Sequence, residues 1–383
     1  MSSVGVAVAV LVAAFLAWLG ARLLARAAAD KPIALDDTLD GLRKVHLQPI
    51  PRIGGVAVFA GLAGGAVAQW ALDGALGTWP LLLLLCVAPG FVWGLIEDLS
   101  KRGAVPVRLA LTAVAAALGY ILLDARITDL DVPGLDNLLA ISAFSFAFTV
   151  FAVTGVSHAI NVIDGLNGLS GVNALLAAIG LALVAWAVGD ALVFGAACVL
   201  AASVAGFFLI NYPRGRIFLG DGGAYLVGLM LAELSVILVQ RNSEVSPWFP
   251  LMLLAYPIWE TLFSMYRRRM RGQSTGEADA LHLHSLVYRR LARWKGFAAT
   301  PYDHVTRNSV ASACLWILPA LCFLVALASW DESLPLQAAA VIFAIGYVAF
   351  YRRIVRFGMP AWFTITSKAA PTEDDEGEQR NIA

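Results

Sequence analysis

Three short polar segments interrupt the long apolar runs of this 383-residue chain, and each of them carries a carboxylate. They read GLIEDLSKR at 94–102, NVIDGLNGL at 161–169 and RIFLGDGGAYLVG at 216–228, and a fourth segment, ADALHLHSL at 278–286, adds two histidines. Carboxylate and amide oxygens are the ligands that Mg²⁺ prefers in proteins. If all four segments face the same side, they predict a metal-phosphate site at a membrane surface.

The segment NVIDGLNGL places Asn161, Asp164 and Asn167 at successive spacings of three residues. If the segment is helical, these side chains share one face, while Gly165 and Gly168 keep the opposite side slim. Oxygen donors in this arrangement suit Mg²⁺. An ordinary polar turn between two apolar segments explains the same residues equally well.

Asp221 is followed by Gly222 and Gly223 and then by another apolar segment. This order exposes backbone N–H groups at a helix N-terminus, where a phosphate can bind, and leaves the Asp221 carboxylate free to hold a metal. Arg216 lies just upstream. The alternative is a tight turn into the apolar segment, because short Gly-Asp-Gly strings are common.

Glu97 and Asp98 are adjacent at the end of an apolar segment, and Lys101 follows one turn later. Neighbouring side chains on a helix point about 100° apart, so one carboxylate can face a site while the other meets solvent or a cation. A solvated helix end with local ion pairs explains these charges when they are taken alone.

His282 and His284 lie in a segment that carries arginines on both sides. Imidazole groups in such a segment can donate hydrogen bonds to a pyrophosphate or offset the charge that develops on it. Metal ligation is less favoured because no cysteine or third histidine is near, although Asp279 offers a carboxylate. A plain basic loop beside a membrane is the simple alternative.

The elements that must position these residues are membrane helices. Hydrophobic residues make up 60% of the chain and charged residues 14%, whereas the apolar content of a soluble domain is nearer to about half. We predict an all-α polytopic membrane protein with about eleven transmembrane helices, since windows of roughly 17–25 mostly apolar residues can cross a bilayer. The windows are 4–25, 53–72, 79–96, 106–123, 138–157, 171–188, 191–210, 224–240, 248–265, 309–329 and 335–351.

Cation placement predicts how the chain is oriented. If successive loops alternate sides, every Lys and Arg except Arg126 and Arg241 falls on one side, and positive charge near span ends stays cytoplasmic. We therefore expect the N-terminus outside, the C-terminus inside, and all four motif segments on the cytoplasmic face of the inner membrane. We expect residues 1–366 to form one membrane domain, and the acidic residues 367–383 to be a disordered tail.

Five segments together carry a resemblance that covers most of the chain. They are RKVHLQPIPRIGG at 43–55, GLIEDLSKR, HAINVIDGLNGLSG, FLGDGGAYLVG and ADALHLHSL. In this order they resemble the polyprenyl-phosphate N-acetylhexosamine-1-phosphate transferases of glycosyltransferase family 4. The resemblance implies a multi-pass enzyme that transfers a sugar 1-phosphate, most simply N-acetylglucosamine 1-phosphate, from a UDP-sugar to undecaprenyl phosphate and releases UMP. Such an enzyme starts a lipid-linked glycan of the cell envelope.

The same resemblance implies roles for individual residues. Asp221 and Asn161 would approach the metal, which is Mg²⁺ or in its place Mn²⁺, and Asp98 and Asp164 would lie around the phosphates with Glu97. The histidine segment matches at Asp279, His282 and His284, and the expected substrate-binding residues are Lys101, Gly54, Gly55, Asn167, Gly222, Gly223, Arg216 and Asp279. The implied partners are a UDP-sugar, a polyprenyl phosphate and the bilayer, with no nucleic acid and with a homodimer left open.

Some positions depart from the family pattern, and other functions stay open. The departures are Glu97 for the first Asp of a pair, Asn167 for Asp, His158 for Asn, Ala224 for Ser, and Ser285 for a third His. They indicate a divergent branch rather than the peptidoglycan enzyme that uses UDP-MurNAc-pentapeptide, which remains the nearest alternative. A transporter is a second alternative, but it would place ionisable groups near the middle of broken spans, where the sequence offers only Glu233 and Glu260.

Overall fold

The computed structural model describes residues 3–30, 50–72, 74, 77–272, 281–292 and 303–356. Within these ranges the regular structure is entirely helical, as predicted. The fifteen helices are α1 (Ser3–Asp30), α2 (Gly54–Leu72), α3 (Trp79–Ser100), α4 (Val105–Leu122), α5 (Leu135–Leu139), α6 (Ser142–Ile163), α7 (Leu169–Ala187), α8 (Ala191–Asn211), α9 (Gly220–Arg241), α10 (Trp248–Leu253), α11 (Ala255–Met270), α12 (Leu283–Ala292), α13 (Asp303–Leu315), α14 (Ile317–Ala328) and α15 (Ser333–Val355).

Ten helical segments of the described chain are long and apolar enough to cross a membrane. Nine of them are α1, α2, α3, α4, α6, α7, α8, α9 and α15, and the tenth runs through α13 and α14 over His304–Ala328. The prediction of a multi-pass membrane protein is therefore confirmed. The tail at 367–383 lies outside the described residues, and the orientation of the termini stays a prediction.

The ninth predicted span, 248–265, is not one continuous helix. The segment is divided into α10 and α11, with a break at Leu254, and neither piece is among the ten candidate spans. Pro257 lies in the first turn of α11 and has no N–H to donate to the carbonyl of Leu253, so a helix cannot run through this point with all its bonds. The hydropathy of the segment revealed its apolar character but not this interruption.

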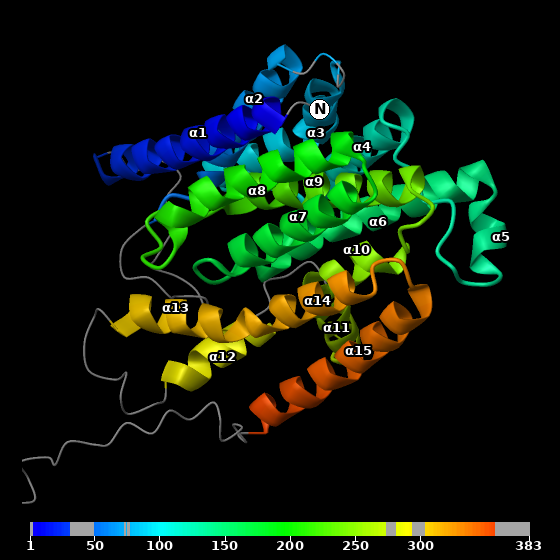
Figure 1. The fold of residues 1–383 in the computed structure, drawn as a ribbon. Helices are drawn as coiled ribbons and strands as arrows, with labels where there is room; N and C mark the ends of the chain where they lie inside the picture. Colours follow the sequence, from blue (N-terminus) through cyan, green and yellow to red (C-terminus); the bar gives the residue numbers. More distant parts are fainter. Residues whose placement is uncertain are drawn as a thin grey trace, which may run out of the picture.

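The helix α9 lies at the centre of the bundle, with α1 and α2 on one side and α12 to α15 on the other (Figure 1). About 89% of its apolar window is buried inside the protein, compared with 11% for α15. A helix that is apolar on all sides can be surrounded by other helices. Because α9 begins at Gly220, immediately before Asp221, its burial fixes the position of that carboxylate.

Glycines allow α2 and α3 to approach α9 closely. A Cβ atom built on Gly55 would lie 2.4 Å from the Cα of Gly223, and one built on Gly94 would lie 2.6 Å from the Cα of Gly222. Only glycine fits at such backbone-to-backbone contacts, which are typical of helix pairs in membranes. The glycine pair at 54–55 and the pair at 222–223 thus meet in the structure, where they serve helix packing.

We expect Gly55→Ala to destabilise the protein by about 1–3 kcal/mol, because the added methyl group meets backbone that cannot move aside. The matched control is Gly155→Ala in α6, where a new Cβ would meet no atom within 4 Å. The melting temperature and the yield of monodisperse protein in detergent measure the difference. Equal melting temperatures for the two variants would contradict the packing role of Gly55.

Candidate active site

The carboxylate of Asp98 binds the first turn of α9. Its Oδ1 accepts a hydrogen bond from the backbone N–H of Asp221 at 3.0 Å, and its Oδ2 accepts one from the N–H of Gly222 at 2.9 Å. The first N–H groups of a helix have no partner within the helix, and a negative charge is favourable at this end of the helix dipole. Asp98, at the end of α3, therefore fixes the position of Asp221.

This contact changes the expected role of the glycine pair after Asp221. We expected the amides at the start of α9 to receive a phosphate of the substrate, but those of Asp221 and Gly222 are already bonded to Asp98. Gly222 and Gly223 are buried against α3 and α2. A phosphate must therefore be bound by other groups than these two amides.

Asp221 joins residues from three separate parts of the chain. Its Oδ1 accepts a hydrogen bond from the side-chain amide of Asn161, at 2.8 Å, and one from Nη2 of Arg52, at 3.3 Å. The Nε atom of Arg52 also lies 4.0 Å from Oδ1 of Asp98. The Arg52 side chain is 40% exposed and that of Asp221 24% exposed, so this cluster can be reached from outside.

Carboxylate and amide oxygens dominate the cluster, and these are the donors that Mg²⁺ prefers. The described residues contain no group of three His, Cys, Asp or Glu side chains arranged to hold a metal. Asp221 and Asn161 nevertheless fit two positions of an octahedral Mg²⁺ site, since Mg²⁺ commonly keeps several waters and takes one or two carboxylates. The side-chain amide of Asn161 donates to Asp221 here, and a half-turn of the amide presents its oxygen instead.

The segment NVIDGLNGL does not form a single helical face. The helix α6 ends at Ile163, and Asp164 and Asn167 lie in the turn that leads to α7. Only Asn161 remains on the helix, so the expectation that three side chains line up on one face is wrong. Gly165 and Gly168 follow within this turn, where Gly168 has a φ of 76°, a value that favours glycine.

Asp164 stays close to the cluster although it has left the helix. The hydroxyl of Ser170 donates a hydrogen bond to its Oδ1. Burial among surrounding atoms raises the pKa of Asp164 to about 6, against the lowering effect of the Ser170 bond and of the Arg52 charge. A carboxyl group with this pKa is mostly ionised at pH 7 and becomes protonated as the pH falls through about 6.

Asn167 is buried inside the protein and is not open to a substrate. Its side chain is fully buried and donates to the carbonyl of Pro213, while its backbone N–H donates to the side chain of Asn308. The side chain of Asn211 receives the neighbouring N–H of Gly168. Asn167 therefore holds the loop after α8 and the helix α13 together, and this placement does not support its predicted contact with a substrate.

The two histidines meet the turn after α6. His284 lies directly against Gly165, because a Cβ built on Gly165 would be only 2.2 Å from its Nε2. The rings of His282 and His284 are stacked, with centroids 5.4 Å apart and planes 9° from parallel. Both side chains are buried. The structure thus brings the histidine segment against the NVIDGLNGL turn, which the sequence left separated by more than a hundred residues.

Glu97 points away from its neighbour Asp98, toward α4. Its Oε1 lies 4.0 Å from Nε of Arg108, and Arg108 in turn contacts the hydroxyl of Tyr225 at 3.4 Å. The His158 ring lies 4.9 Å from the Tyr225 ring. Glu97 therefore positions an arginine near the start of α9, as adjacent carboxylates on a helix are expected to diverge.

The remaining predicted residues fall at the edge of the site or outside the described chain. Lys101 is exposed and ends α3 with a left-handed φ of 54°. Arg216 is exposed in the loop between α8 and α9. Gly54 packs against Phe207 and the carbonyl of Phe218. Asp279 lies outside the described residues.

Sequence reasoning missed the contacts of Arg52 and Arg108 at the site. Both entered it only as cations that set the topology, because an arginine at the end of a span is common. Arg52 directly precedes the Ile53-Gly54-Gly55 part of a motif, and Arg108 follows the carboxylate pair by about ten residues. Position next to a motif was the available signal.

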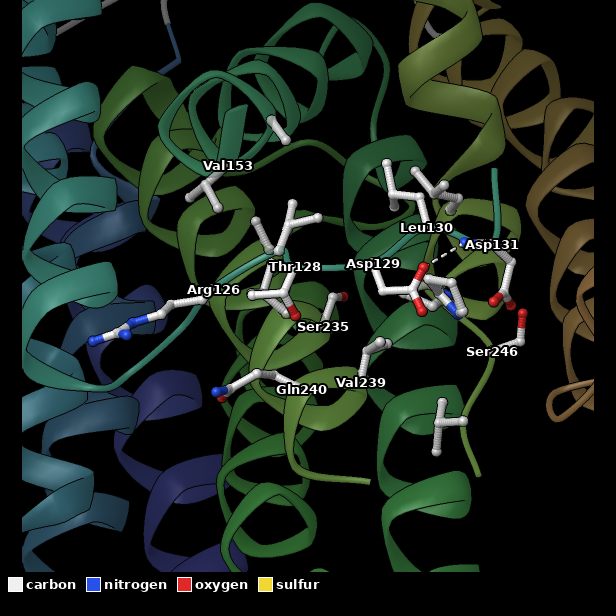
Figure 2. Close-up of a pocket in the computed structure, with 18 of the residues that line it drawn as sticks. Arg126, Thr128, Asp129, Leu130, Asp131, Val153, Ser235, Val239, Gln240 and Ser246 are labelled. Carbon is white, nitrogen blue, oxygen red and sulfur yellow. Dashed lines mark hydrogen bonds between the residues drawn. The ribbon is translucent and has the colours of Figure 1, made fainter. Parts of the chain in front are cut away.

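A cavity of about 400 Å³ lies elsewhere in the molecule, at the far end of α9. Figure 2 shows Thr128, Asp129, Ser235 and Val239 around it. Ser235 comes fourteen residues after Asp221, which corresponds to about 21 Å along a helix. This cavity is therefore separate from the carboxylate cluster.

Comparison with known proteins agrees with this geometry. Residues 80–239 match glycosyl transferase family 4, and this range contains Glu97, Asp98, Asn161, Asp164 and Asp221. Over this range the chain is similar to that family. The histidine segment and the motif that contains Arg52 lie outside the matched range. In the structure His284 contacts Gly165 and Arg52 contacts Asp221, so both segments join the residues of the matched range.

Three relatives illustrate the similarity. The chain is 26% identical over 250 residues to a probable undecaprenyl-phosphate N-acetylglucosaminyl 1-phosphate transferase of Bacillus subtilis, with 63% of this chain and 66% of the relative covered. It is 27% identical to an undecaprenyl-phosphate alpha-N-acetylglucosaminyl 1-phosphate transferase of Salmonella typhi, with coverages of 64% and 67%. It is 28% identical to a decaprenyl-phosphate N-acetylglucosaminephosphotransferase of Mycobacterium tuberculosis, with coverages of 63% and 66%. The match thus spans about two thirds of the length of these relatives.

The contact between Gly165 and His284 can be tested without any activity assay. Gly165→Ala should lower the melting temperature, because its new methyl group collides with the imidazole ring. In a His284→Ala background the same change should have little effect, since the colliding ring is gone. Melting curves of the four proteins measure this coupling. Additive effects of the two substitutions would show that the ring is not seated on Gly165.

Proposed function

We propose that this protein transfers N-acetylglucosamine 1-phosphate from UDP-N-acetylglucosamine to a polyprenyl phosphate and releases UMP. The observation that carries the proposal is the meeting of Asp98, Asn161, Asp221 and Arg52 at the buried start of α9. The names of these three relatives all specify N-acetylglucosamine and a polyprenyl phosphate. They favour this donor over UDP-MurNAc-pentapeptide, and the family match favours transfer over transport.

The reaction brings two anions together. An oxygen of the polyprenyl phosphate attacks the β-phosphorus of the UDP-sugar, the bond from this phosphorus to the bridging oxygen breaks, and its electron pair leaves with UMP. Phosphoryl transfer of this kind depends mainly on positioning and on neutralisation of charge. A phosphate with a second pKa near 6 is already largely ionised at neutral pH, so the acceptor needs orientation more than it needs a strong base.

The arginines and carboxylates have distinct tasks in this proposal. The partly exposed guanidinium group of Arg52 binds phosphate oxygens, since arginine offers several donors in a fixed plane. Asp98 holds the start of α9, so its catalytic contribution is to fix Asp221. Asp164 lies around the phosphates, and His282 and His284 donate hydrogen bonds to the pyrophosphate.

Asp221 and Asn161 would hold Mg²⁺, or Mn²⁺ in its place, beside the phosphates. The ion supplies charge neutralisation to the reacting phosphate and to the leaving UMP. The carboxylate of Asp221 and a flipped amide of Asn161 offer it two oxygens. If Arg52 left Asp221 to bind the substrate, the Asp221 carboxylate would become available to the ion.

We place the site at the cytoplasmic face of the inner membrane, with the N-terminus outside and the C-terminus inside. The support is the one-sided distribution of Lys and Arg. A UDP-sugar donor is also charged and water-soluble, and a basic membrane face attracts it. A homodimer remains a prediction that the single chain does not address.

A transfer assay decides between donors. Purified protein with undecaprenyl phosphate and Mg²⁺ should release UMP with UDP-N-acetylglucosamine at least ~10-fold faster than with UDP-MurNAc-pentapeptide, as a site matched to one polar substituent discriminates strongly. Radiolabel from the sugar should appear in the lipid phase. The proposed reaction would be refuted if only the pentapeptide donor yielded UMP, or if neither donor yielded any.

Asp221→Asn should reduce transfer on the order of 100-fold or more at ordinary Mg²⁺ concentration, since a lost metal interaction is worth several kcal/mol in the transition state. The isosteric amide keeps an oxygen for Asn161 and Arg52, so the melting temperature should stay close to that of the wild type. Asp331→Asn, an exposed change beside the distant cavity, is the control. Unchanged activity and Mg²⁺ dependence in Asp221→Asn would remove Asp221 from the metal site.

A further inference from the structure

Glu260 is a completely buried carboxylate on α11 that accepts hydrogen bonds from three donors in two other parts of the chain. Its Oε1 lies 3.1 Å from Nδ1 of His282 and accepts the backbone N–H of Leu283, also at 3.1 Å. Its Oε2 accepts the hydroxyl of Tyr347 on α15. A buried carboxylate is costly unless its oxygens are well bonded, and here both oxygens are used.

A second anchor holds the residue before His282. The Leu281 carbonyl accepts a hydrogen bond from Nη1 of Arg267 at 2.8 Å and one from the hydroxyl of Tyr351 at 3.0 Å. The same Nη1 atom donates to the Tyr351 hydroxyl at 2.8 Å. Two pairs of residues therefore fix the segment 281–283. Each pair joins a charged residue of α11 to a tyrosine of α15: Glu260 with Tyr347, and Arg267 with Tyr351.

The bond to Glu260 also fixes the state of the His282 ring. An ionised carboxylate can only accept hydrogen bonds, so Nδ1 of His282 must carry a proton. The other ring nitrogen, Nε2, faces away from Glu260, and with a proton of its own it can donate a hydrogen bond to a phosphate oxygen. A carboxylate that orients a histidine in this way selects its tautomer, and the loss of that carboxylate has a large effect on the function of the ring.

We propose that Glu260, assisted by Tyr347, is a positioning residue that orients His282 for the phosphate-bearing substrate. This proposal rests on the function proposed above. It assigns a role to α15, which otherwise lies at the periphery with little of its apolar window buried. Tyr347 and Tyr351 of this last span would make the geometry of the histidine segment depend on the correct docking of α15 against α11.

Glu260→Gln tests the proposal, because glutamine keeps the shape but can present either an oxygen or an NH₂ group to His282. We expect kcat to fall on the order of 10-fold or more, while the KM for UDP-N-acetylglucosamine changes by less than about threefold. Glu260→Asp should recover part of the activity, and Tyr347→Phe should lower it by a smaller factor. The matched control, Glu244→Gln, changes an exposed carboxylate at the rim of the distant cavity and should be neutral.

A double-mutant cycle separates positioning from general damage. If Glu260 acts through His282, Glu260→Gln should cost little further activity in a His282→Gln background. Additive losses, or a loss of activity that follows the loss of folded protein, would overturn the proposal. So would a wild-type kcat in Glu260→Gln.

Nitrogen NMR gives a readout that does not need turnover. The chain has five histidines, so the signals of ¹⁵N-histidine protein can be assigned by loss of the His282 signal in His282→Gln. Wild-type protein should show a protonated Nδ1 at His282, and Glu260→Gln should show a mixture of tautomers. An Nδ1 that carries no proton in the wild type refutes the positioning role. If no UDP-sugar supports transfer, the proposed function fails, and the NMR result still decides whether Glu260 orients His282.

Discussion

The arrangement of the site depends on one interaction, the bond pair between the Asp98 carboxylate and the first amides of α9. It satisfies two backbone donors that have no partner within the helix and places a negative charge at the positive end of the helix dipole. It also brings the buried carboxylate of Asp98 near the partly exposed carboxylate of Asp221. Two neighbouring anions repel each other, and Arg52 lies within 4.0 Å of both. The two carboxylates therefore favour the binding of a further cation, either beside Arg52 or in its place.

Close helix packing makes this interaction possible. Asp98 reaches the amides of α9 because Gly94, one turn earlier on α3, lets the two backbones touch at Gly222. The contact of Gly55 with Gly223 brings α2, and with it Arg52, to the same point. Glycines that seemed in the sequence to be openings for a phosphate are thus the reason that the charged side chains can converge.

The sequence predicted the class of fold, and three of the residues that it singled out, Asp98, Asn161 and Asp221, meet in the structure. Both results depend on local features. Long apolar runs determine spans, and Asp98, Asn161 and Asp221 lie in short polar segments at their ends. It could not predict the outcome for Asn167, whose burial depends on Asn308 from a distant helix, nor the helix break at Leu254. The roles of Arg52 and of Tyr347 were also out of reach. Each of them depends on contacts between segments that are far apart in the chain.

The two halves of the site are held in different ways, and this difference follows from their chemistry. Asp98 and Asp221 lie at the ends of the long helices α3 and α9, and the contact between these two backbones at Gly94 and Gly222 fixes their positions. His282 directly precedes α12 and His284 lies in its first turn, and Leu281 and His282 themselves have no regular structure. Ordering such a segment costs more conformational entropy. The hydrogen bonds of its backbone to the side chains of Glu260 and Arg267 offset that cost. A group that must meet a substrate from outside the helix bundle therefore needs its own carboxylate and arginine, and the helix α11 carries both.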